Sequence, residues 1–168
     1  MANFGKRNKT VGEVTICEDF VRFPKLDINN KARMRMEISE TNLIEKAMEM
    51  LKFSYAPYSN FFVGAALLSK SGKIYGGCNI ENAAYGPSNC AERTAIFKAV
   101  SEGVKDFEAI CIVGGKNGKV KDFCPPCGVC RQVMREFCAP DFKIILAKSV
   151  SEFKIFTLAE LLPESFSL

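Results

Sequence analysis

The sequence predicts an α/β fold built as a single domain. Segments whose apolar residues recur at helical spacing alternate along the chain with continuous apolar runs of strand length. Such runs are typical of strands that are covered on both faces, so helices are expected to pack on the sheet. The 168 residues match the common size of one domain, and a hydrophobic content of 48% is enough for a core without disulfide bonds.

The first half of the body is predicted to be a helix followed by a β-hairpin. Apolar residues recur at helical spacing over residues 43–51, and Ser39 or Thr41 can cap the start of this helix. Two apolar runs, 61–68 and 73–79, then flank a short turn that contains glycine. Two strands joined in this way indicate a hairpin.

The second half is predicted to alternate between helices and strands. After a loop over residues 80–89, a helix presents apolar residues on one face until Gly103 ends it. The run 109–114 is expected to be a strand buried on both faces. Another helix begins at Cys127, and its inward residues are expected to be Val129, Val133, Met134 and Phe137. The remaining expected elements are strands at 144–147 and 153–156 and a helical turn at 158–162.

The chain is expected to consist of an N-terminal extension, residues 1–38, and a single catalytic domain, residues 39–168. The extension shows no sustained periodicity, and we expect it to be flexible or to derive in part from an expression vector. It carries eight Lys or Arg and five Asp or Glu, whereas the body carries fifteen and fourteen. The nearly neutral body lacks the basic footprint of a nucleic-acid-binding protein, so no nucleic-acid partner is expected.

The cellular setting is predicted from the apolar segments and the cysteines. No apolar run follows the basic N-terminal residues as in a secretory signal, and no stretch approaches the roughly 18 apolar residues of a membrane span. No membrane association is therefore expected. Eight cysteines in such a chain favour metal binding or thiol chemistry in a reducing compartment, so we expect a cytoplasmic protein.

The absence of histidine restricts the possible chemistry. A serine or cysteine nucleophile activated by histidine is excluded, and so is an HExxH metal site. Any zinc ligands must be cysteines, alone or with acidic residues. Any general acid or base must be Glu, Asp, Lys or Tyr.

Two cysteine motifs indicate a zinc site. They are Cys90-Ala91-Glu92 and, after a long interval, Pro126-Cys127-Gly128-Val129-Cys130. A CxxC motif alone fits a structural zinc half-site or a thiol–disulfide pair, but structural zinc commonly has four protein ligands, and the chain offers neither a second CxxC nor a histidine. Three thiolates with one position left for water are typical of catalytic zinc. We therefore predict that Cys90, Cys127 and Cys130 bind one Zn²⁺.

Glu92 is the predicted catalytic residue. It lies two residues from a predicted ligand, near enough to exchange protons with a water there without binding the metal. Zinc lowers the pKa of bound water to about 7, and a carboxylate can take the released proton and deliver it to a leaving group. Zinc deaminases combine a Cys-x-Glu or His-x-Glu motif with PCxxC for this purpose.

Two arginines are candidates to compensate the charge of the metal site. Three thiolates leave Zn²⁺ with a net negative charge, which opposes the ionisation of bound water. Arg93 could donate a hydrogen bond to a ligand sulfur, and Arg131 could do the same. The alternative for each is a solvated charge on a helix surface.

Five motifs occur along the body in this order: residues 56–61, 63–66, 77–85, 90–95 and 126–132. Together they resemble the small, homotetrameric cytidine deaminases over roughly residues 37–166. The resemblance implies a three-layer α/β/α sandwich with a mixed five-stranded sheet and one zinc ion per subunit. It also implies hydrolysis of cytidine and 2′-deoxycytidine to uridine and 2′-deoxyuridine, with release of ammonia, in pyrimidine salvage.

The resemblance implies substrate contacts for further residues. Phe61 would stack on the pyrimidine, while Asn79 and Glu81 would hydrogen-bond the ribose 3′-hydroxyl. The backbone of Ala91 and the carboxyl of Glu92 would bind the amide edge of the ring.

Tyr85 and Phe166 would complete the active sites of neighbouring subunits in the tetramer that the resemblance implies. The residue types agree with the assigned contacts, since an aromatic face suits a planar base. Asn79 and Glu81, two residues apart at a strand end, point to one face. Without the surrounding motifs, however, Phe61 would fit an ordinary core position, and the two polar residues would fit a turn.

Several alternatives remain open. A related zinc deaminase could act on blasticidin S or on a base within RNA, although the near-neutral body speaks against an RNA footprint. A non-enzymatic structural-zinc module conflicts with the missing fourth ligand, and a CxxC redox protein leaves Glu92 unexplained. Cys124 is expected to be a bystander near the ligands. The cysteines expected to be buried small apolar residues or free thiols are Cys17, Cys78, Cys111 and Cys138.

Overall fold

The computed structural model describes residues 40–166, so the predicted extension over residues 1–38, with Cys17, lies outside the described residues. The helices are α2 (Glu40–Met50), α3 (Ala91–Ser101), α4 (Gly128–Phe137) and α5 (Leu158–Leu161), with a 3₁₀ turn, η1 (Leu51–Phe53). The strands are β1 (Phe61–Ser69), β2 (Ile74–Cys78), β3 (Phe107–Lys116), β4 (Lys143–Ser149) and β5 (Glu152–Thr157). All of the predicted helices and strands are confirmed, and β3 is longer than predicted by two residues at each end.

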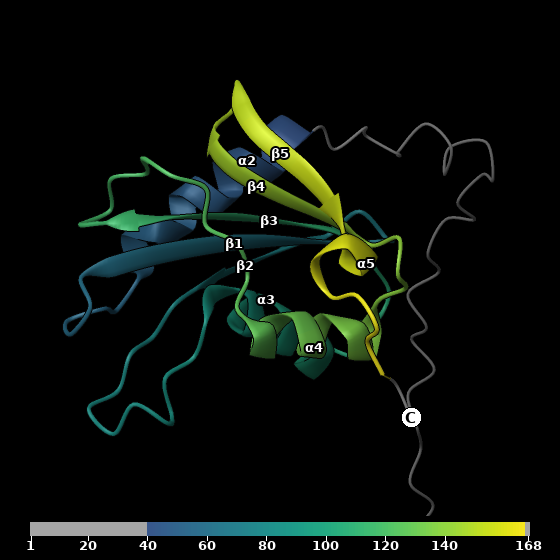
Figure 1. Cartoon of the computed structure of the whole chain (residues 1–168), viewed down its shortest axis with the longest axis horizontal. Coiled ribbons are helices and arrows are strands. Elements are labelled where there is room, and N and C mark those ends of the chain that lie inside the picture. The colour runs from purple at the N-terminus through teal and green to yellow at the C-terminus, as the bar shows by residue number, and fades with distance from the viewer. Residues whose placement is uncertain (1–39, 167–168) are drawn as a thin grey trace, which may run out of the picture. The chain divides into compact units, whose positions relative to one another are not determined.

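The strands form one mixed sheet in the order β2-β1-β3-β4-β5 (Figure 1). β1 pairs antiparallel with both β2 and β3, β3 pairs parallel with β4, and β4 pairs antiparallel with β5. Because β2 and β3 are both antiparallel to β1, they run in the same direction. Their carboxyl ends therefore lie at the same edge of the sheet.

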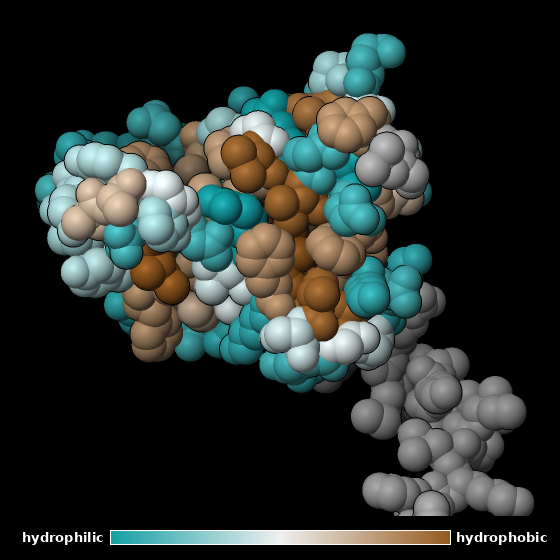
Figure 2. Space-filling model, turned by 90° about the horizontal axis from the view of Figure 1, so that it is seen from below, coloured by the Kyte–Doolittle hydropathy of each residue, from teal (hydrophilic) through white to brown (hydrophobic). Residues whose placement is uncertain are grey.

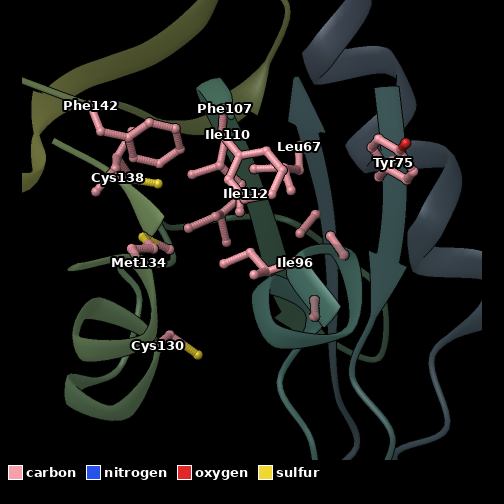
Figure 3. Close-up of a cluster of buried hydrophobic side chains, with 14 of the residues drawn as sticks. Leu67, Tyr75, Ile96, Phe107, Ile110, Ile112, Cys130, Met134, Cys138 and Phe142 are labelled. Atoms are coloured by element: carbon pink, nitrogen blue, oxygen red, sulfur yellow. The ribbon is translucent and has the colours of Figure 1, made fainter. Parts of the chain in front are cut away.

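Helices cover the two faces of the sheet, as Figure 1 shows. On one face α2 packs against β1 and β3 through its buried residues Leu43, Ile44 and Ala47. On the other face lie α3 and α4, and Figure 3 shows Ile96 of α3 and Met134 of α4 within one buried cluster. This is the three-layer arrangement that the sequence resemblance implies.

The continuous apolar run in the middle of β3, residues 109–113, follows from this arrangement. Ile110 and Ile112 belong to the cluster beneath α3 and α4, whereas Cys111 and Val113 belong to the cluster beneath α2. Successive side chains of a strand point to opposite faces, so a strand covered on both sides must be apolar at every position.

The ends of the helices have local causes in the sequence. Gly103 follows α3 with φ +82°, a left-handed conformation that glycine adopts without steric cost, which confirms it as the end of the helix. α5 begins with a capping box, in which Thr157 Oγ1 accepts from the Glu160 N–H and Glu160 accepts from the Thr157 N–H. Among residues 40–166, no helix is long and apolar enough to cross a membrane.

One prediction about α4 is wrong. Val129 was expected to point inward, but 58% of its surface is exposed. The residues that α4 buries completely are Cys130 and Met134, which lie one turn apart. Val129 lies about 100° around the helix from Cys130, and so it adjoins the buried stripe without being part of it.

Candidate metal centre and active site

Two helix N-termini meet where the parallel-running strands β2 and β3 end. Cys90 directly precedes α3 and Cys127 directly precedes α4, each with an extended backbone, and neither side chain caps its helix. Cys130 lies in the first turn of α4, and Figure 3 shows its sulfur directed toward α3. The topology of the sheet thus brings together three thiols that are far apart in the sequence.

The three thiols have the spacing of a zinc site. Their sulfur atoms all lie within 4.8 Å of one another, and Cys90 Sγ is 3.9 Å from Cys127 Sγ. Tetrahedral zinc with Zn–S bonds of about 2.3 Å places two ligand sulfurs about 3.8 Å apart. The donor set and its spacing therefore fit Zn²⁺ without a rearrangement of the backbone.

Arg93 provides a positive charge beside these sulfurs. Its Nη2 donates to Cys90 Sγ at 3.6 Å and to the carbonyl of Ser88 at 3.2 Å. In the protein without metal, hydrogen bonding by the Cys130 thiol and by Arg93 lowers the pKa of Cys90 to about 5, although burial opposes the shift. The hydrogen bond to Cys90 in turn raises the pKa of Cys130. Cys90 is thus an anion at neutral pH even before it binds metal.

Glu92 is a buried carboxyl group next to the thiols. It lies in the first turn of α3, and 4% of its surface is exposed. Burial raises its pKa to about 7, and the nearby charge of Cys90 adds to the effect. A carboxyl with a pKa near neutrality can both accept and return a proton at physiological pH.

A cavity of about 270 Å³ opens onto this cluster. Cys90, Cys127 and Glu92 contribute to its wall, so any molecule inside reaches both the metal ligands and the buried carboxyl. Asn79 and Glu81 border the same cavity, as does Ala91. Three of the six predicted substrate-binding residues, Asn79, Glu81 and Ala91, thus line this cavity, whereas Phe61 does not.

The family described as "Cytidine and deoxycytidylate deaminase zinc-binding region" matches residues 37–146. A cytidine deaminase of Halalkalibacterium halodurans is 50% identical over 125 residues, which are 74% of this chain and 92% of that protein. One of Sporosarcina psychrophila is 49% identical over 125 residues, which are 74% of this chain and 89% of that protein.

A solved structure agrees with the sequence matches. The crystal structure of a cytidine deaminase from Burkholderia pseudomallei superposes with a TM-score of 0.70 at 43% identity, and the match covers 76% of this chain and 99% of that chain. The chain belongs to the cytidine deaminase family. It is of the small-subunit type, in which three cysteines, here Cys90, Cys127 and Cys130, hold the zinc ion. Cytidine deaminases are zinc-dependent hydrolases, so the prediction of a zinc enzyme is confirmed.

Within this cytidine deaminase fold, Asn79 and Glu81 also organise the backbone. The Asn79 amide accepts from the Val63 N–H at 2.9 Å and donates to the Phe61 carbonyl at 2.8 Å. Glu81 Oε2 accepts from the N–H groups of Tyr58 and Ser59. Hydrogen bonds from Ser59 and Tyr58 lower the pKa of Glu81, which keeps it an anion.

The structure places Phe61 beside the catalytic cavity rather than in its wall. Its ring borders a second cavity, and it packs over Gly114 together with Cys124. A Cβ atom on Gly114 would lie 3.1 Å from Phe61 Cε1 and 2.8 Å from Cys124 Sγ. Cys124, expected to be a bystander, therefore lies close to the Phe61 ring and also lines the catalytic cavity. Only its position three residues before Cys127 hinted at this in the sequence.

The other predicted site residues lie apart from the thiols. Arg131 does not donate to a ligand sulfur: its Nε donates to the carbonyl of Pro126 at 2.8 Å, and its Nη1 donates to the carbonyl of Leu161. It therefore fixes the start of α4 to the end of α5. Tyr85 and Phe166 are 73% and 68% exposed, and neither borders the catalytic cavity.

Proposed function

We propose that this chain hydrolyses cytidine and 2′-deoxycytidine to uridine and 2′-deoxyuridine, with release of ammonia. The observation that carries the proposal is a buried carboxyl, Glu92, beside three thiols at zinc spacing, all facing one cavity of about 270 Å³. Relatives that are about half identical in sequence are named cytidine deaminases, which supports the same substrate here. We place the reaction in pyrimidine salvage.

Glu92 is the proposed proton carrier. When bound, zinc supplies a Lewis acid that makes water acidic enough to lose a proton near pH 7. The Glu92 carboxylate accepts that proton and delivers it to the ring nitrogen beside the amino-bearing carbon. The hydroxide oxygen bonds to that carbon, and Glu92 takes the proton that remains on the added hydroxyl and delivers it to the amino nitrogen. The carbon–nitrogen bond then breaks, so that ammonia leaves and the oxygen remains as the carbonyl of uridine. A pKa of about 7 suits a group that must do both.

Arg93 stabilises the charge of the site by its hydrogen bond to Cys90. A guanidinium beside a ligand thiolate withdraws negative charge from the sulfur, so the metal remains electrophilic. Arg131 acts differently, because its hydrogen bonds stabilise the start of α4, where Cys127 and Cys130 lie.

Substrate binding is assigned to the residues around the cavity. The free oxygen of Glu81 and the remaining donor of Asn79 are available to a ribose hydroxyl, while the backbone of Ala91 lies beside Glu92 at the base edge. The Phe61 ring lies close to Cys124 of the cavity wall and would stack on the pyrimidine.

We also propose a homotetramer in which neighbouring subunits complete each site. Tyr85 and Phe166 are exposed aromatic side chains of the kind that is enriched at interfaces. Figure 2 shows a hydrophobic area across one face of the molecule. Phe97 of α3 and Val129 of α4 are 46% and 58% exposed. An exposed apolar area of this kind is typical of a contact surface.

The chain is further proposed to consist of an extension, residues 1–38, and a catalytic domain, residues 39–168, acting in the cytoplasm. The family match begins at residue 37, which supports this boundary. Thiolate ligands require reduced cysteines, and every cysteine among residues 40–166 is free.

The activity is tested by following ultraviolet absorbance as cytidine is converted to uridine. Zinc-loaded protein is expected to convert cytidine and 2′-deoxycytidine and to leave blasticidin S and a cytosine-containing oligonucleotide unchanged. Failure to convert either nucleoside would refute the proposal.

The role of Glu92 is tested with Glu92→Gln, which is expected to keep stoichiometric zinc and lose at least about a thousandfold in kcat, because the proton carrier is gone. Glu45→Gln, an exposed position on α2, is the matched control and should keep full activity. Turnover by Glu92→Gln close to that of the control would remove Glu92 from its proposed role.

The tetramer is tested by sedimentation and by mixing. Two inactive variants, Glu92→Gln and Tyr85→Ala, are expected to regain part of the activity when mixed, because a subunit with an intact Tyr85 completes the site of one with an intact Glu92. A stable and fully active monomer would contradict the shared site.

A further inference from the structure

Three lysines line one surface cavity beside the catalytic site. Lys116 is the last residue of β3, Lys119 and Lys121 follow it before α4, and all three border a cavity of about 340 Å³. Within residues 40–166 none of the three forms an ion pair. The cavity also exposes the rings of Phe61 and Phe123. It therefore combines unpaired positive charge with aromatic surface.

The loop that carries these lysines is held in one shape. The Lys119 N–H donates to the Lys116 carbonyl at 3.0 Å, and the Asn117 N–H donates to the Asn60 carbonyl at 2.7 Å, which fixes the turn to the start of β1. A Cβ atom on Gly115 would lie 2.0 Å from the Lys119 carbonyl oxygen, so the loop folds back closely over β3. The lysines are thus presented from a fixed backbone.

Two more lysines lie close to Phe123, a residue that borders the cavity. The amino groups of Lys148 and Lys154 lie 5.2 Å and 4.7 Å from the centre of the Phe123 ring. Lys148 pairs with Glu152, and Asp122 contributes one carboxylate to the cavity. Five lysines against two carboxylates concentrate positive charge here, on a domain that is otherwise nearly neutral.

We infer that this lysine cavity binds a phosphate-bearing small molecule of the nucleotide class. Its phosphate lies among Lys116, Lys119 and Lys121, where lysine ammonium groups act as point charges for the anion. Its base packs against Phe61, because aromatic faces attract planar rings. The volume is at the lower end of the range for small-molecule sites, about 300–1,000 Å³, enough for the phosphate and part of the ring.

The site is distinct from the thiol cluster but shares a wall with the catalytic cavity. Phe61 and Cys124 pack over the same glycine, Gly114, with Phe61 bordering the lysine cavity and Cys124 the catalytic one. An occupant of the lysine cavity would therefore restrict the Phe61 ring. Binding itself requires neither zinc nor turnover, so it can be tested independently of the proposed deamination.

The test is calorimetric titration of the zinc-loaded full-length chain with uridine 5′-monophosphate and, in parallel, with uridine. We expect the monophosphate to bind at least about tenfold more tightly than uridine, since charge-assisted contacts to a phosphate are strong. The combined variant K116Q/K119Q/K121Q should abolish this difference while zinc content and cytidine turnover stay unchanged.

A matched control keeps the change in net charge the same. The combined variant K52Q/K98Q/K105Q removes three exposed lysines elsewhere and should retain the preference for the monophosphate. Equal affinities for uridine and its monophosphate, or equal losses in the two variants, would overturn the inference.

Two further probes identify the part of the ligand that is recognised. Ribose 5-phosphate is expected to bind more weakly than uridine 5′-monophosphate because it lacks a base, and equal affinity would overturn the role of Phe61. Binding of a single-stranded oligonucleotide without binding of the monophosphate would overturn the proposal in favour of a nucleic-acid surface.

Discussion

The Arg93 guanidinium is hydrogen-bonded to the Cys90 sulfur across one turn of α3, with Nη2 3.6 Å from Sγ. The same nitrogen donates to the Ser88 carbonyl in the loop before the helix. A single side chain thus sets both the charge of a zinc ligand and the shape of the loop that leads to it.

Arg93→Gln is expected to weaken zinc binding by roughly tenfold to a hundredfold, because partners of a metal ligand are worth that much in affinity. Zinc affinity is measured by competition with a chromogenic chelator. Lys98→Gln, an exposed position on the same helix, is the control and should bind zinc as the parent does. Equal zinc affinities in the two variants would show that Arg93 does not act on the metal site.

Zinc removal is expected to make Cys90 reactive at pH 6. Its pKa of about 5 leaves it a thiolate there, whereas burial raises the pKa values of Cys111 and Cys138 to about 12. Iodoacetamide followed by peptide mass analysis should find Cys90 alkylated in metal-free protein and protected in zinc-loaded protein. Labelling of Cys90 that does not depend on zinc would argue against its role as a ligand.

In the metal-free protein, Glu92 is expected to make folding stability depend on pH. A carboxyl whose pKa rises from 4.5 to about 7 on folding is penalised as an anion, so its cost is absent below pH 4.5 and complete above pH 7. Metal-free Glu92→Gln should therefore be more stable than the parent at pH 8 by up to about 3 kcal/mol, with little difference at pH 4.5. Urea unfolding of both proteins at the two pH values measures the difference. A difference in unfolding free energy that does not change with pH would mean that the substitution acts through packing.

Gly77→Ala is expected to disturb the site from outside it. A Cβ atom at this position in β2 would lie 2.3 Å from the Ala91 carbonyl oxygen and 2.5 Å from the Ala95 nitrogen, both in the backbone of α3. Because backbone atoms cannot rotate away, the helix that carries Glu92 must shift. We expect a loss of about 1–3 kcal/mol in unfolding free energy together with a loss of cytidine turnover.

The control for this substitution is Gly128→Ala, where a Cβ atom would meet nothing within 4 Å. This variant should be at least as stable as the parent, since alanine favours a helix more than glycine does. A Gly77→Ala variant as stable and active as the control would show that α3 adjusts without cost.

The parts of the structure that could be predicted from sequence are those set by local spacing. β3 is apolar over residues 109–113 because both of its faces are covered there, and Gly103 ends α3 because of its backbone freedom. Arg93 lies three residues from Cys90, one helical turn away, so its contact followed from spacing alone.

What could not be predicted depends on contacts between distant segments. The Leu161 carbonyl that Arg131 binds lies 30 residues away and on another helix, which no local pattern specifies. Val129 has the same hydrophobic character as a core residue, and the sequence does not distinguish a side chain that faces the core from one that lies on the exposed side of the helix. The position of Cys124 in the wall of the catalytic cavity likewise depends on a distant segment, since its sulfur lies over Gly114 of β3.

The positions of the zinc ligands have a consequence for the lifetime of the folded chain. Cys90 and Cys127 are 37 residues apart, and the segment between them contains all of α3 and β3. A metal bound to both closes this segment into a ring that passes through the middle of the sheet. Because the three thiols come together only in the folded chain, zinc binds the folded state and stabilises it in proportion to its affinity. The supply of zinc during synthesis therefore governs how long each copy resists unfolding and proteolysis, as well as whether it can react.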